Sequence, residues 1–444
     1  MLKKVLIANR GEIAIRIIRA CKELGIETVA IYSEGDISSL HTKFADESVC
    51  VGPTPPDLSY LSIPHIISAC EVTGVEAVHP GYGFLSENPR FAEICEENGF
   101  KFIGPSPYSV RLAGDKLNAR NEMKKVGIPV IPGSDGPINS IEEAIKIAEN
   151  IGYPVIIKAA LGGGGRGMRI ANNKEELENS LPIAKGEAKT AFGDDKVYLE
   201  KYFISPRHIE VQILADDYNN IIWLGERECS IQRRHQKLIE EAPSPGITQK
   251  QREEIGNYAV MAAKSISYRS AGTVEFLFDA NNKFYFMEIN SRIQVEHPVT
   301  EMVTGIDIVK EQLKIAAGEE IKIKQSEIKI KGHAMECRIN AEDYKNGFLP
   351  SPGKVNGLYL PGGPGIRVDT HLYSGYYVPP NYDSLIAKLI VHGETRSECI
   401  ARMERALVEF LIEGIHTTIP FHQEIIKDER FRRGELHTHF LNPK

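Results

Sequence analysis

Strand-like and helix-like apolar patterns alternate over the first hundred residues, and this alternation limits the possible folds more than any other feature. "KKVLIAN" reads as a strand, "GEIAIRIIRACKELG" as an amphipathic helix and "IETVAIYS" as a second strand. "IPHIISACEVTG" and "VEAVHPGYG" repeat the helix and the strand before "KFIGP". Such alternation is typical of a doubly wound, parallel α/β sheet, so we predict a Rossmann-like N-terminal domain over residues 1–103. The first turn, "ANRGE", lacks the G-x-G-x-x-G pattern, and no dinucleotide site is predicted.

The rest of the chain divides into further parts. With 444 residues, the protein is too long for one hydrophobic core. A polar helical segment at 104–130 suits a connection, and short strands and helices around a glycine cluster suggest a small lobe at 131–202. Strand-like segments followed by helices near 304–317 and 395–413 indicate a larger α+β domain over 203–444. We therefore predict a multidomain protein of mixed α/β and α+β class.

Charge and cysteine usage narrow the classes of function. The formal net charge of −7 argues against nucleic acid or an anionic membrane as the main partner. The sequence contains no run of about 18 apolar residues, which a membrane-spanning helix would need, and the N-terminus does not resemble an export signal. The seven cysteines are odd in number and form no CxxC pair, so neither a disulfide framework nor a zinc site is predicted. We expect a soluble, cytoplasmic protein.

The stretch "YPVIIKAALGGGGRGMRI" carries the first chemical signal. A strand rich in Val and Ile delivers Lys158, and four glycines follow it, ahead of Arg166 and Gly167. Glycines let backbone N–H groups approach a phosphate closely, and the lysine supplies a fixed positive charge. A flexible linker is the alternative, but strand-like segments flank the glycines on both sides. The pattern favours a phosphate-binding loop.

A predicted hairpin brings two carboxylates together. "GTVEFLFD" and "KFYFMEIN" flank the turn sequence "ANN", and a loop of two or four residues places Glu275 directly opposite Glu288. Facing carboxylates repel each other unless a cation lies between them. With Asn290 further along the same face, the pattern predicts a site for Mg²⁺ or Mn²⁺. A loop of three or five residues would separate the two glutamates, and a solvated acidic face is the alternative.

Polar residues continue at intervals of two beyond this hairpin. Glu288, Asn290, Arg292, Gln294 and Glu296 share one face if the strand continues. The proline in "VEHPVTE" favours a strand that ends before Glu296, which would leave this carboxylate on a turn.

Together these features resemble the ATP-grasp enzymes, and more specifically the biotin carboxylases, which carboxylate biotin with ATP and bicarbonate. The motifs that carry the resemblance are "IANRGEIAIRIIRA", "HPGYGFLSEN", "GDK", "KAALGGGGRGMR", "ERECSIQRRHQK", "EEAPSP", "EINSRIQVEHPVTE", "GHAMECRINAED", "PSPGKV" and "PPNYDSLIAKLI". They span nearly the whole chain in order. In this family the first domain would be the pre-ATP-grasp domain, and the lobe at 131–202 would be the lid.

The resemblance implies an ATP site. Lys116 and Lys158 would hold the phosphates under a lid that runs from Gly162 to Gly167. The stretch from Glu200 to Phe203 would take the adenine, largely through its backbone. The implied ATP contacts are Lys116, Lys158, Gly163, Gly164, Gly165, Arg166, Gly167, Glu200, Lys201, Phe203, His208, Gln232, His235, Lys237 and Leu277.

The resemblance also implies a reaction centre. Arg292, Gln294 and the backbone of Val295 would hold bicarbonate, and Glu296 would remove its proton so that it attacks the γ-phosphate. The carboxyphosphate formed would give CO₂ and phosphate, and the phosphate would deprotonate biotin. Arg338 would stabilise the resulting enolate-like oxygen, with Tyr82 near the biotin ring. The implied catalytic residues are Lys237, Arg292, Glu296 and Arg338. From the residues alone, Arg338 also suits a structural ion pair with Glu342 or Asp343, and the two uses are not exclusive.

Partners follow from the same resemblance. No biotin-accepting domain and no carboxyltransferase domain follow Lys444, so a separate biotin carboxyl carrier protein and separate carboxyltransferase subunits are expected. That is the arrangement of the acetyl-CoA carboxylase that is built from several subunits and serves fatty-acid synthesis. The family implies a homodimer, and two Mg²⁺ or Mn²⁺ ions per site.

Several alternatives stay open. A two-subunit pyruvate carboxylase, or a propionyl-CoA or other acyl-CoA carboxylase, would use almost the same chain. A carbamoyl-phosphate or purine-pathway ligase would share the glycine-rich loop and the metal pair. A non-catalytic nucleotide-binding subunit is the third alternative. The sequence argues against it, because such a subunit would not need an acid-base residue beside an anion site.

Overall fold

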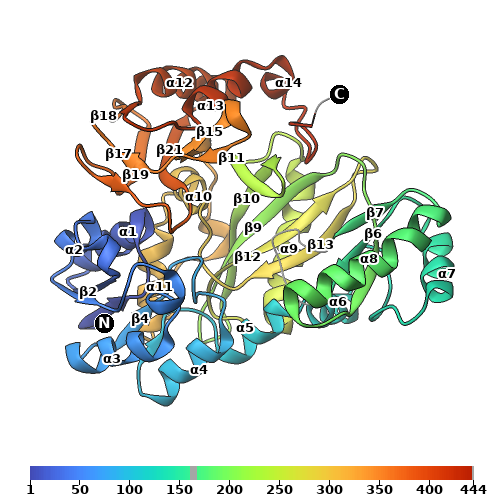
Figure 1. Cartoon of the computed structure of the whole chain (residues 1–444), viewed down its shortest axis with the longest axis horizontal. Helices are drawn as coiled ribbons and strands as arrows, with labels where there is room; N and C mark the ends of the chain where they lie inside the picture. Colours follow the sequence, from blue (N-terminus) through green and yellow to red (C-terminus); the bar gives the residue numbers. More distant parts are fainter. Residues whose placement is uncertain (161–167, 443–444) are drawn as a thin grey trace.

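The computed structural model describes residues 1–160 and 168–442, and its N-terminal part is built on a parallel sheet (Figure 1). The strand order is β3-β2-β1-β4-β5, and all neighbours are parallel, as the alternation predicts. The strands are β1 (Lys4–Ile7), β2 (Glu27–Tyr32), β3 (Glu47–Cys50), β4 (Ala77–His79) and β5 (Lys101–Phe102). The helices are α1 (Gly11–Glu23), α2 (Leu40–Phe44), α3 (Ile63–Thr73) and α4 (Pro89–Glu97). Val5 and Ile7 pack in one core with α1, and Leu6 packs in another with α3 and α4, which explains the continuous apolar run of β1.

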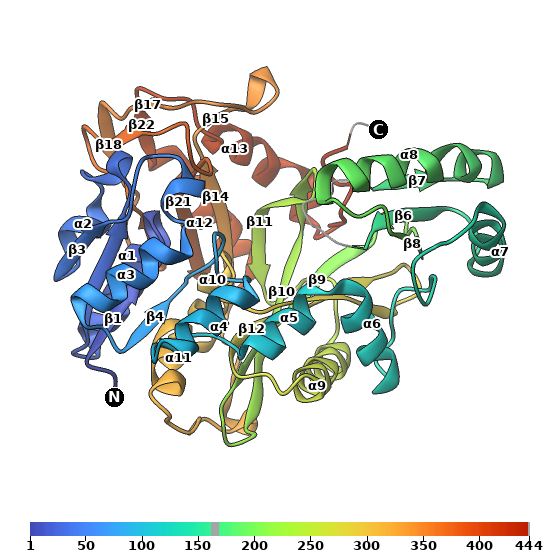
Figure 2. The same ribbon diagram turned by 60° about the horizontal axis from the view of Figure 1, so that its bottom comes forward.

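Two helices lead from this sheet to the next part of the chain. They are α5 (Pro107–Gly114) and α6 (Lys116–Lys125), and they meet at Asp115. The Asp115 carboxylate accepts a hydrogen bond from the backbone N–H of Asn118 and so caps α6. This cap fixes Lys116 as the first residue of α6. Figure 2 shows both helices between the N-terminal sheet and the lobe on the right.

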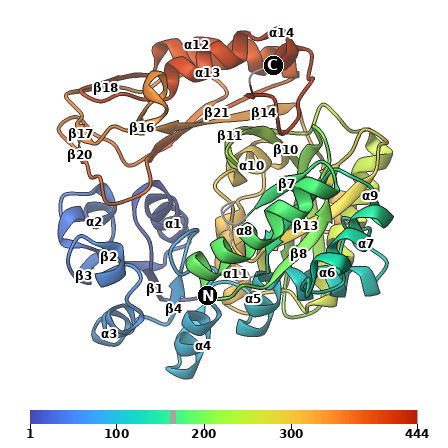
Figure 3. The same cartoon turned by 45° about the vertical axis from the view of Figure 1, so that its right-hand side comes forward.

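The lobe contains a three-stranded antiparallel sheet with the order β7-β6-β8. Its elements are β6 (Val155–Ala159), β7 (Arg169–Ala171), β8 (Val197–Lys201), α7 (Ile141–Ile151) and α8 (Lys174–Phe192). Apolar side chains from Ile138 to Leu199 form a core that belongs to the lobe alone. In Figure 1 the lobe lies at the right and the N-terminal domain at the left, and in Figure 3 the lobe comes forward.

An eight-stranded antiparallel sheet links the middle of the chain to its C-terminal part. Its order is β13-β12-β9-β10-β11-β14-β21-β19. The strands are β9 (Arg207–Ala215), β10 (Ile221–Arg233), β11 (Gln236–Ala242), β12 (Ser270–Phe278), β13 (Phe284–Asn290), β14 (His333–Asn340), β19 (Ile366–Thr370) and β21 (Leu385–Gly393). The helices are α9 (Gln249–Ser265), α10 (His297–Thr304), α11 (Ile308–Ala316), α12 (Arg396–Glu409), α13 (Ile419–Lys427) and α14 (Glu429–Arg432). Short pairs complete this part: β15 (Glu342–Asp343) with β16 (Leu349–Pro350), β17 (Gly353–Lys354) with β20 (Tyr377–Val378), and β18 (Gly357–Tyr359) with β22 (Leu411–Glu413).

The hairpin of β12 and β13 reaches the predicted pairing by an unexpected route. Glu275 lies directly opposite Glu288, as predicted. The expected loop of two or four residues is wrong, however, because Phe278 pairs with Phe284 and leaves five residues between them. An irregularity in the pairing at Met287 adds one residue to β13 and restores the register at the glutamates.

Strand β13 ends at Asn290, so it does not carry all five regularly spaced polar residues. Arg292 and Gln294 lie in the following loop, and Glu296 immediately precedes α10 with φ −82° and ψ 12°. Pro298 lies in the first turn of α10, where its missing N–H is not needed for a helical hydrogen bond. The prediction of one continuous strand face is therefore wrong beyond Asn290, and the placement of Glu296 on a turn is confirmed.

Among the described residues, no helix is both long and apolar enough to cross a membrane.

Candidate active site

A cleft of about 1000 Å³ opens between the small lobe, the β10–β11 hairpin, β13 and the loop that contains Tyr82. It brings together most of the residues that the sequence analysis singled out. The predicted site residues that line it are Tyr82, Lys116, Lys158, Lys201, Phe203, His208, Gln232, His235, Lys237, Glu275, Leu277, Glu288, Asn290, Arg292, Gln294, Val295 and Arg338.

The remaining predicted residues do not line the cleft. Glu200 is buried and forms an ion pair with Lys158 at 2.6 Å. Glu296 is fully buried and contacts the cleft-lining side chains of Lys237 and Arg338. Gly163, Gly164, Gly165, Arg166 and Gly167 lie outside the described residues.

The turn between β10 and β11 has a strained backbone. Arg233 pairs with Gln236, which leaves Arg234 and His235 as a two-residue loop, with φ of 49° and 66°. This conformation costs residues with a Cβ roughly 1–3 kcal/mol each, and such strain often occurs at functional sites. The turn places His235 in the wall of the cleft and starts β11, which delivers Lys237.

Lys237 lies at the centre of a buried group of carboxylates. Its Nζ is 2.9 Å from Glu275 Oε1 and 2.7 Å from Glu296 Oε1, and it also donates to Glu210. Burial opposes the charged ammonium group, but the three carboxylates outweigh burial and raise the pKa of Lys237 well above its ordinary value. Lys237 is therefore a permanently charged group that faces the cleft.

Glu296 is held ionised by its neighbours. Burial favours the neutral acid, but Lys237, Arg338 and Arg227 lower the pKa of Glu296 well below its ordinary value. Arg338 donates from Nη2 to Glu296 Oε2 at 2.8 Å. A general base works best when its pKa lies close to neutrality. In this structure the pKa of Glu296 lies far below that range.

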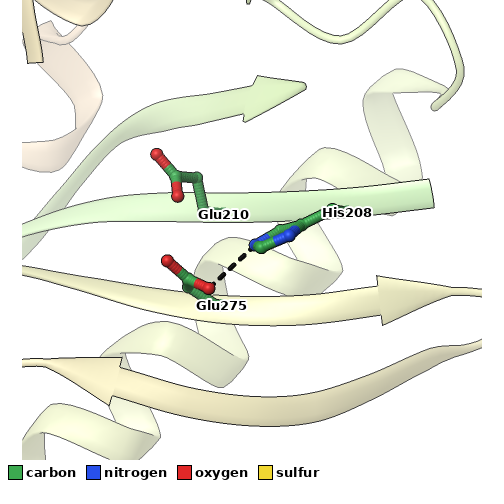
Figure 4. Close-up of side chains that lie close together, drawn as sticks. All are labelled: His208, Glu210 and Glu275. Atoms are coloured by element: carbon green, nitrogen blue, oxygen red, sulfur yellow. Dashed lines mark ion pairs between the residues drawn. The ribbon is translucent and has the colours of Figure 1, made fainter. Parts of the chain in front are cut away.

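Basic side chains occupy the predicted metal edge. Lys116 Nζ is 2.9 Å from Glu288 Oε2. His208 Nε2 is 2.8 Å from Glu275 Oε2, and Figure 4 shows how these two side chains approach each other. Asn290 donates from Nδ2 to Glu275 Oε1 at 2.8 Å. Lys237 and His208 lower the pKa of Glu275 despite its burial. Each carboxylate of the facing pair thus has its own positive partner.

Two clusters of described residues place three potential metal ligands within 4.8 Å of one another. One contains His208, Glu210 and Glu275 (Figure 4), and the other contains Glu210, Cys229 and Glu296. Glu210 belongs to both, and it is already paired with Arg227 and Lys237. Because these two cations supply the positive charge, neither cluster needs a metal ion for its stability.

Arg292 is oriented by the loop that carries it. Its Nη1 donates to Gln294 Oε1 at 2.8 Å, and its Nε lies 3.0 Å from a carboxylate oxygen of Glu87. The Val295 carbonyl accepts a hydrogen bond from Lys388 at 2.9 Å, which ties this loop to β21. The predicted bicarbonate ligands therefore converge, although they leave the strand.

Arg338 pairs with carboxylates other than those considered from the sequence. Its Nε donates to Glu240 Oε1 at 2.6 Å, and its Nη2 reaches Glu296. The alternative pairing with Glu342 or Asp343 is therefore wrong, because Arg338 and Glu240 face the same side of the large sheet.

The other cleft residues have local partners. Lys201 donates from Nζ to the carbonyls of Gly152 and Tyr153 at 2.9 Å. Phe203 stacks on Tyr285 with a centroid distance of 4.8 Å. Gln232 Nε2 lies 2.8 Å from His208 Nδ1 and forms a hydrogen bond with it. The Tyr82 hydroxyl donates a hydrogen bond to Glu12.

Comparison with known proteins places this site in a family. The family model described as "Biotin carboxylase, N-terminal domain" matches residues 1–110, "Carbamoyl-phosphate synthase L chain, ATP binding domain" matches 115–324, and "Biotin carboxylase C-terminal domain" matches 336–443. The chain is 59% identical to the biotin carboxylase of Haemophilus influenzae, in an alignment that covers 100% of this chain and 99% of the relative. The chain belongs to the biotin carboxylase family. It is an enzyme that couples ATP to the carboxylation of biotin, as the sequence motifs indicate.

Further relatives show how widely this fold is used. A pyruvate carboxylase subunit from Methanothermobacter thermautotrophicus is 56% identical, with coverage of 100% of this chain and 90% of the relative. The biotin carboxylase domain dimer of Hydrogenobacter thermophilus 2-oxoglutarate carboxylase, solved with MgADP and bicarbonate, has 54% identity and a TM-score of 0.96. That alignment covers 99% of this chain and 97% of the other. Biotin carboxylase from Campylobacter jejuni has 50% identity and a TM-score of 0.96, with 99% and 98% coverage.

Several residues of this biotin carboxylase site escaped the sequence analysis. Glu210, Arg227 and Glu240 are fully buried and neutralise one another or the predicted residues. The available signal was a charged residue at an inward position of an otherwise apolar strand, as in "RHIEVQILA" and "KLIEEA". Lys388 carries the same signal in the apolar strand "LIAKLIV", whereas Glu87, which contacts Arg292, lies in a turn and carries no such signal.

Proposed function

We propose that this chain carboxylates biotin attached to a separate carrier protein, with MgATP and bicarbonate, and that a carboxyltransferase subunit then uses the carboxybiotin. The group that carries the proposal is the buried cluster of Lys237, Glu296 and Arg338 beside the cleft. It combines a fixed cation, a carboxylate and a guanidinium group at one place, as an anion-activating reaction requires.

Phosphate binding is assigned to basic side chains that line the cleft. Lys116, Lys158, His235 and Lys237 line the cleft, and three of them are lysines whose charge suits ATP phosphates. The glycine-rich segment from Gly162 to Gly167 would add backbone N–H donors. Lys201 and Phe203 lie at the strand end of the lobe, where we propose that adenine binds with Glu200, His208, Gln232 and Leu277 nearby.

Glu275, Glu288 and Asn290 fit a divalent cation. Their oxygens are of the hard type that Mg²⁺ and Mn²⁺ prefer, and both carboxylates hold cationic side chains in the structure. The carboxylates of Glu275 and Glu288 therefore favour a positive charge beside them. A bound metal ion would neutralise phosphate charge at this edge, next to Lys116 and Lys237.

Bicarbonate is assigned to Arg292, Gln294 and the backbone of Val295, with Glu296 as the base. A bicarbonate oxygen attacks the γ-phosphorus, the bond from that phosphorus to ADP breaks, and Glu296 takes the bicarbonate proton. Because Lys237 lowers the pKa of Glu296, a phosphate that attracts Lys237 would weaken this interaction and raise that pKa. The base would become effective when the nucleotide is present.

Arg338 and Tyr82 are assigned to biotin. The carboxyphosphate would break into CO₂ and phosphate, and the phosphate would remove the proton from the ureido nitrogen of biotin. The Arg338 guanidinium, which faces the cleft, would stabilise the negative oxygen that develops.

We further propose a cytoplasmic homodimer that serves acetyl-CoA carboxylase. The dimer is supported by the solved Hydrogenobacter dimer, and a reducing compartment by seven free cysteines. Pyruvate carboxylation is the second candidate, and the similarity to the Methanothermobacter pyruvate carboxylase subunit favours it.

ATP cleavage by the purified chain tests the assignment. We expect cleavage to require bicarbonate and Mg²⁺ or Mn²⁺, and free biotin to stimulate it. An equal rate with bicarbonate and biotin rigorously removed would contradict the proposal. The acceptor is tested by isolating the native biotinylated partner with its carboxyltransferase and offering acetyl-CoA, propionyl-CoA and pyruvate in parallel.

A further inference from the structure

Arg338 forms a hydrogen bond with Glu240, a residue that the proposed mechanism does not use. Its Nε donates to Glu240 Oε1 at 2.6 Å, and Glu240 is fully buried on β11. The other edge of the guanidinium donates to Glu296 at 2.8 Å. Glu240 therefore determines how the guanidinium plane lies relative to the cleft, because a charged acceptor at Nε restricts rotation of the planar group.

Glu240 faces a second buried carboxyl group. Glu336 lies directly opposite Glu240 in the β11–β14 pairing, so their Cβ atoms are about 4.5–5.5 Å apart. Glu336 is also two residues before Arg338 on β14 and points to the same side of the sheet. Its side chain is fully buried, and neither of its oxygens has a hydrogen-bond partner among the described residues. The second oxygen of Glu240 has none either.

Two ionised carboxylates would not be stable in this arrangement. An ionised Glu336 would be a buried carboxylate without a hydrogen-bond partner among the described residues, which is strongly disfavoured, and it would repel the ionised Glu240 opposite it. One proton between them removes both penalties. Burial raises the pKa of Glu240 to about 7, although Arg338 opposes this shift, and burial raises the pKa of Glu336 well above its ordinary value against the opposing charge of Lys388. The charged groups that face the pair are Lys237, Glu296, Arg338 and Lys388.

We infer that Glu240 and Glu336 share one proton behind Arg338, and that this proton keeps Glu240 ionised as the acceptor that orients the guanidinium. Glu336 holds the proton, and Glu240 is the positioning residue. The arrangement matters when Glu296 takes up a proton, because Arg338 then loses the charge of one carboxylate partner and depends on the other. This role for Arg338 in the reaction rests on the proposed function above.

Infrared spectroscopy of the full chain tests the shared proton without any activity. A protonated carboxyl group has a carbonyl stretch separate from that of a carboxylate. We expect the difference spectrum of wild type and Glu336→Gln at pH 7 to show loss of a protonated carboxyl band. An absent band would overturn the inference even if the enzyme carboxylates biotin, and a band in an inactive protein would leave the inference standing while the proposed function fails.

Kinetics test the positioning role. We expect Glu240→Gln to lower kcat of biotin-stimulated ATP cleavage about tenfold, with the KM for ATP nearly unchanged, since a charge-assisted hydrogen bond is lost. Glu336→Gln should keep clearly more turnover than Glu336→Leu, because its amide can donate to Glu240 as the protonated acid does. Thermal unfolding checks that each variant is folded. Wild-type kcat in Glu240→Gln, or equal losses in the two Glu336 variants, would overturn the inference.

Discussion

Replacing Lys237 by methionine tests whether this lysine holds the site together. The ammonium group lies within 2.9 Å of Glu275 and Glu296 and contacts Glu210, and these three carboxylates have side-chain exposures of 4% or less. Methionine has a similar length, so the packing is largely kept while the charge disappears. Removing one partner of a buried ion pair typically costs about 3–5 kcal/mol, because the remaining charge stays buried. We expect the free energy of unfolding, measured in urea, to fall by about this amount at pH 8.

The loss should depend on pH in a defined direction. Without Lys237, burial and mutual repulsion would raise the pKa of the carboxylates above their values in the unfolded chain. A raised pKa gives stability that is present at low pH and is lost as the pH rises through the folded-state value, so the deficit of the variant should grow from about pH 5 to about pH 8. Lys124→Met is the control, since its pair with Asp135 is exposed and should contribute no more than about 1 kcal/mol. A deficit below about 1 kcal/mol, or one that does not change with pH, would refute the reasoning.

Three further variants test two residues of the site and one buried ion pair outside it. Glu296→Gln should abolish turnover and leave nucleotide binding, measured by calorimetry, nearly intact; a large loss of affinity would assign Glu296 to the metal or the nucleotide instead. Glu288→Lys should weaken the use of metal–ATP far more than it lowers the melting temperature, and an unfolded variant would mean that this carboxylate is structural. Burial opposes the ionised form of Glu241, but His333 and Arg396 lower its pKa to about 2, so the stability it contributes should be present above about pH 4.5 and be lost as the pH falls toward 2. Melting curves of Glu241→Gln should therefore depend less on acid than those of wild type, and parallel curves would contradict this.

Local patterns were sufficient to predict the fold where neighbours in sequence are neighbours in space. The parallel N-terminal sheet follows from alternation, because β1, β2 and β3 pair in chain order and so do β4 and β5, while β4 crosses over to pair with β1. The register of β12 and β13 was predicted correctly at Glu275 and Glu288, although the loop and the irregularity at Met287 were not. The loop is one residue longer than predicted, and the extra residue in β13 shifts the register back by one, so the two errors cancelled each other. A bulge leaves little signal in a sequence, since it depends on twist and on contacts with other strands.

The site shows which signals a sequence carries and which it lacks. Spacing by two indicated that Arg292, Gln294 and Glu296 act together, and they do converge, but on a loop and a helix start instead of a strand. The spacing therefore grouped residues that do lie near one another, with the wrong local structure. Burial was the larger omission, because a charged residue within an apolar strand shows that Glu210 and Glu240 are unusual but not which groups they face. Once the β9–β10, β10–β11 and β11–β14 pairings are known, both become expected, since buried cations require buried carboxylates. The buried residues that determine the charge of Lys237, Glu296 and Arg338 thus follow from sheet topology, whereas these three residues themselves follow from sequence motifs.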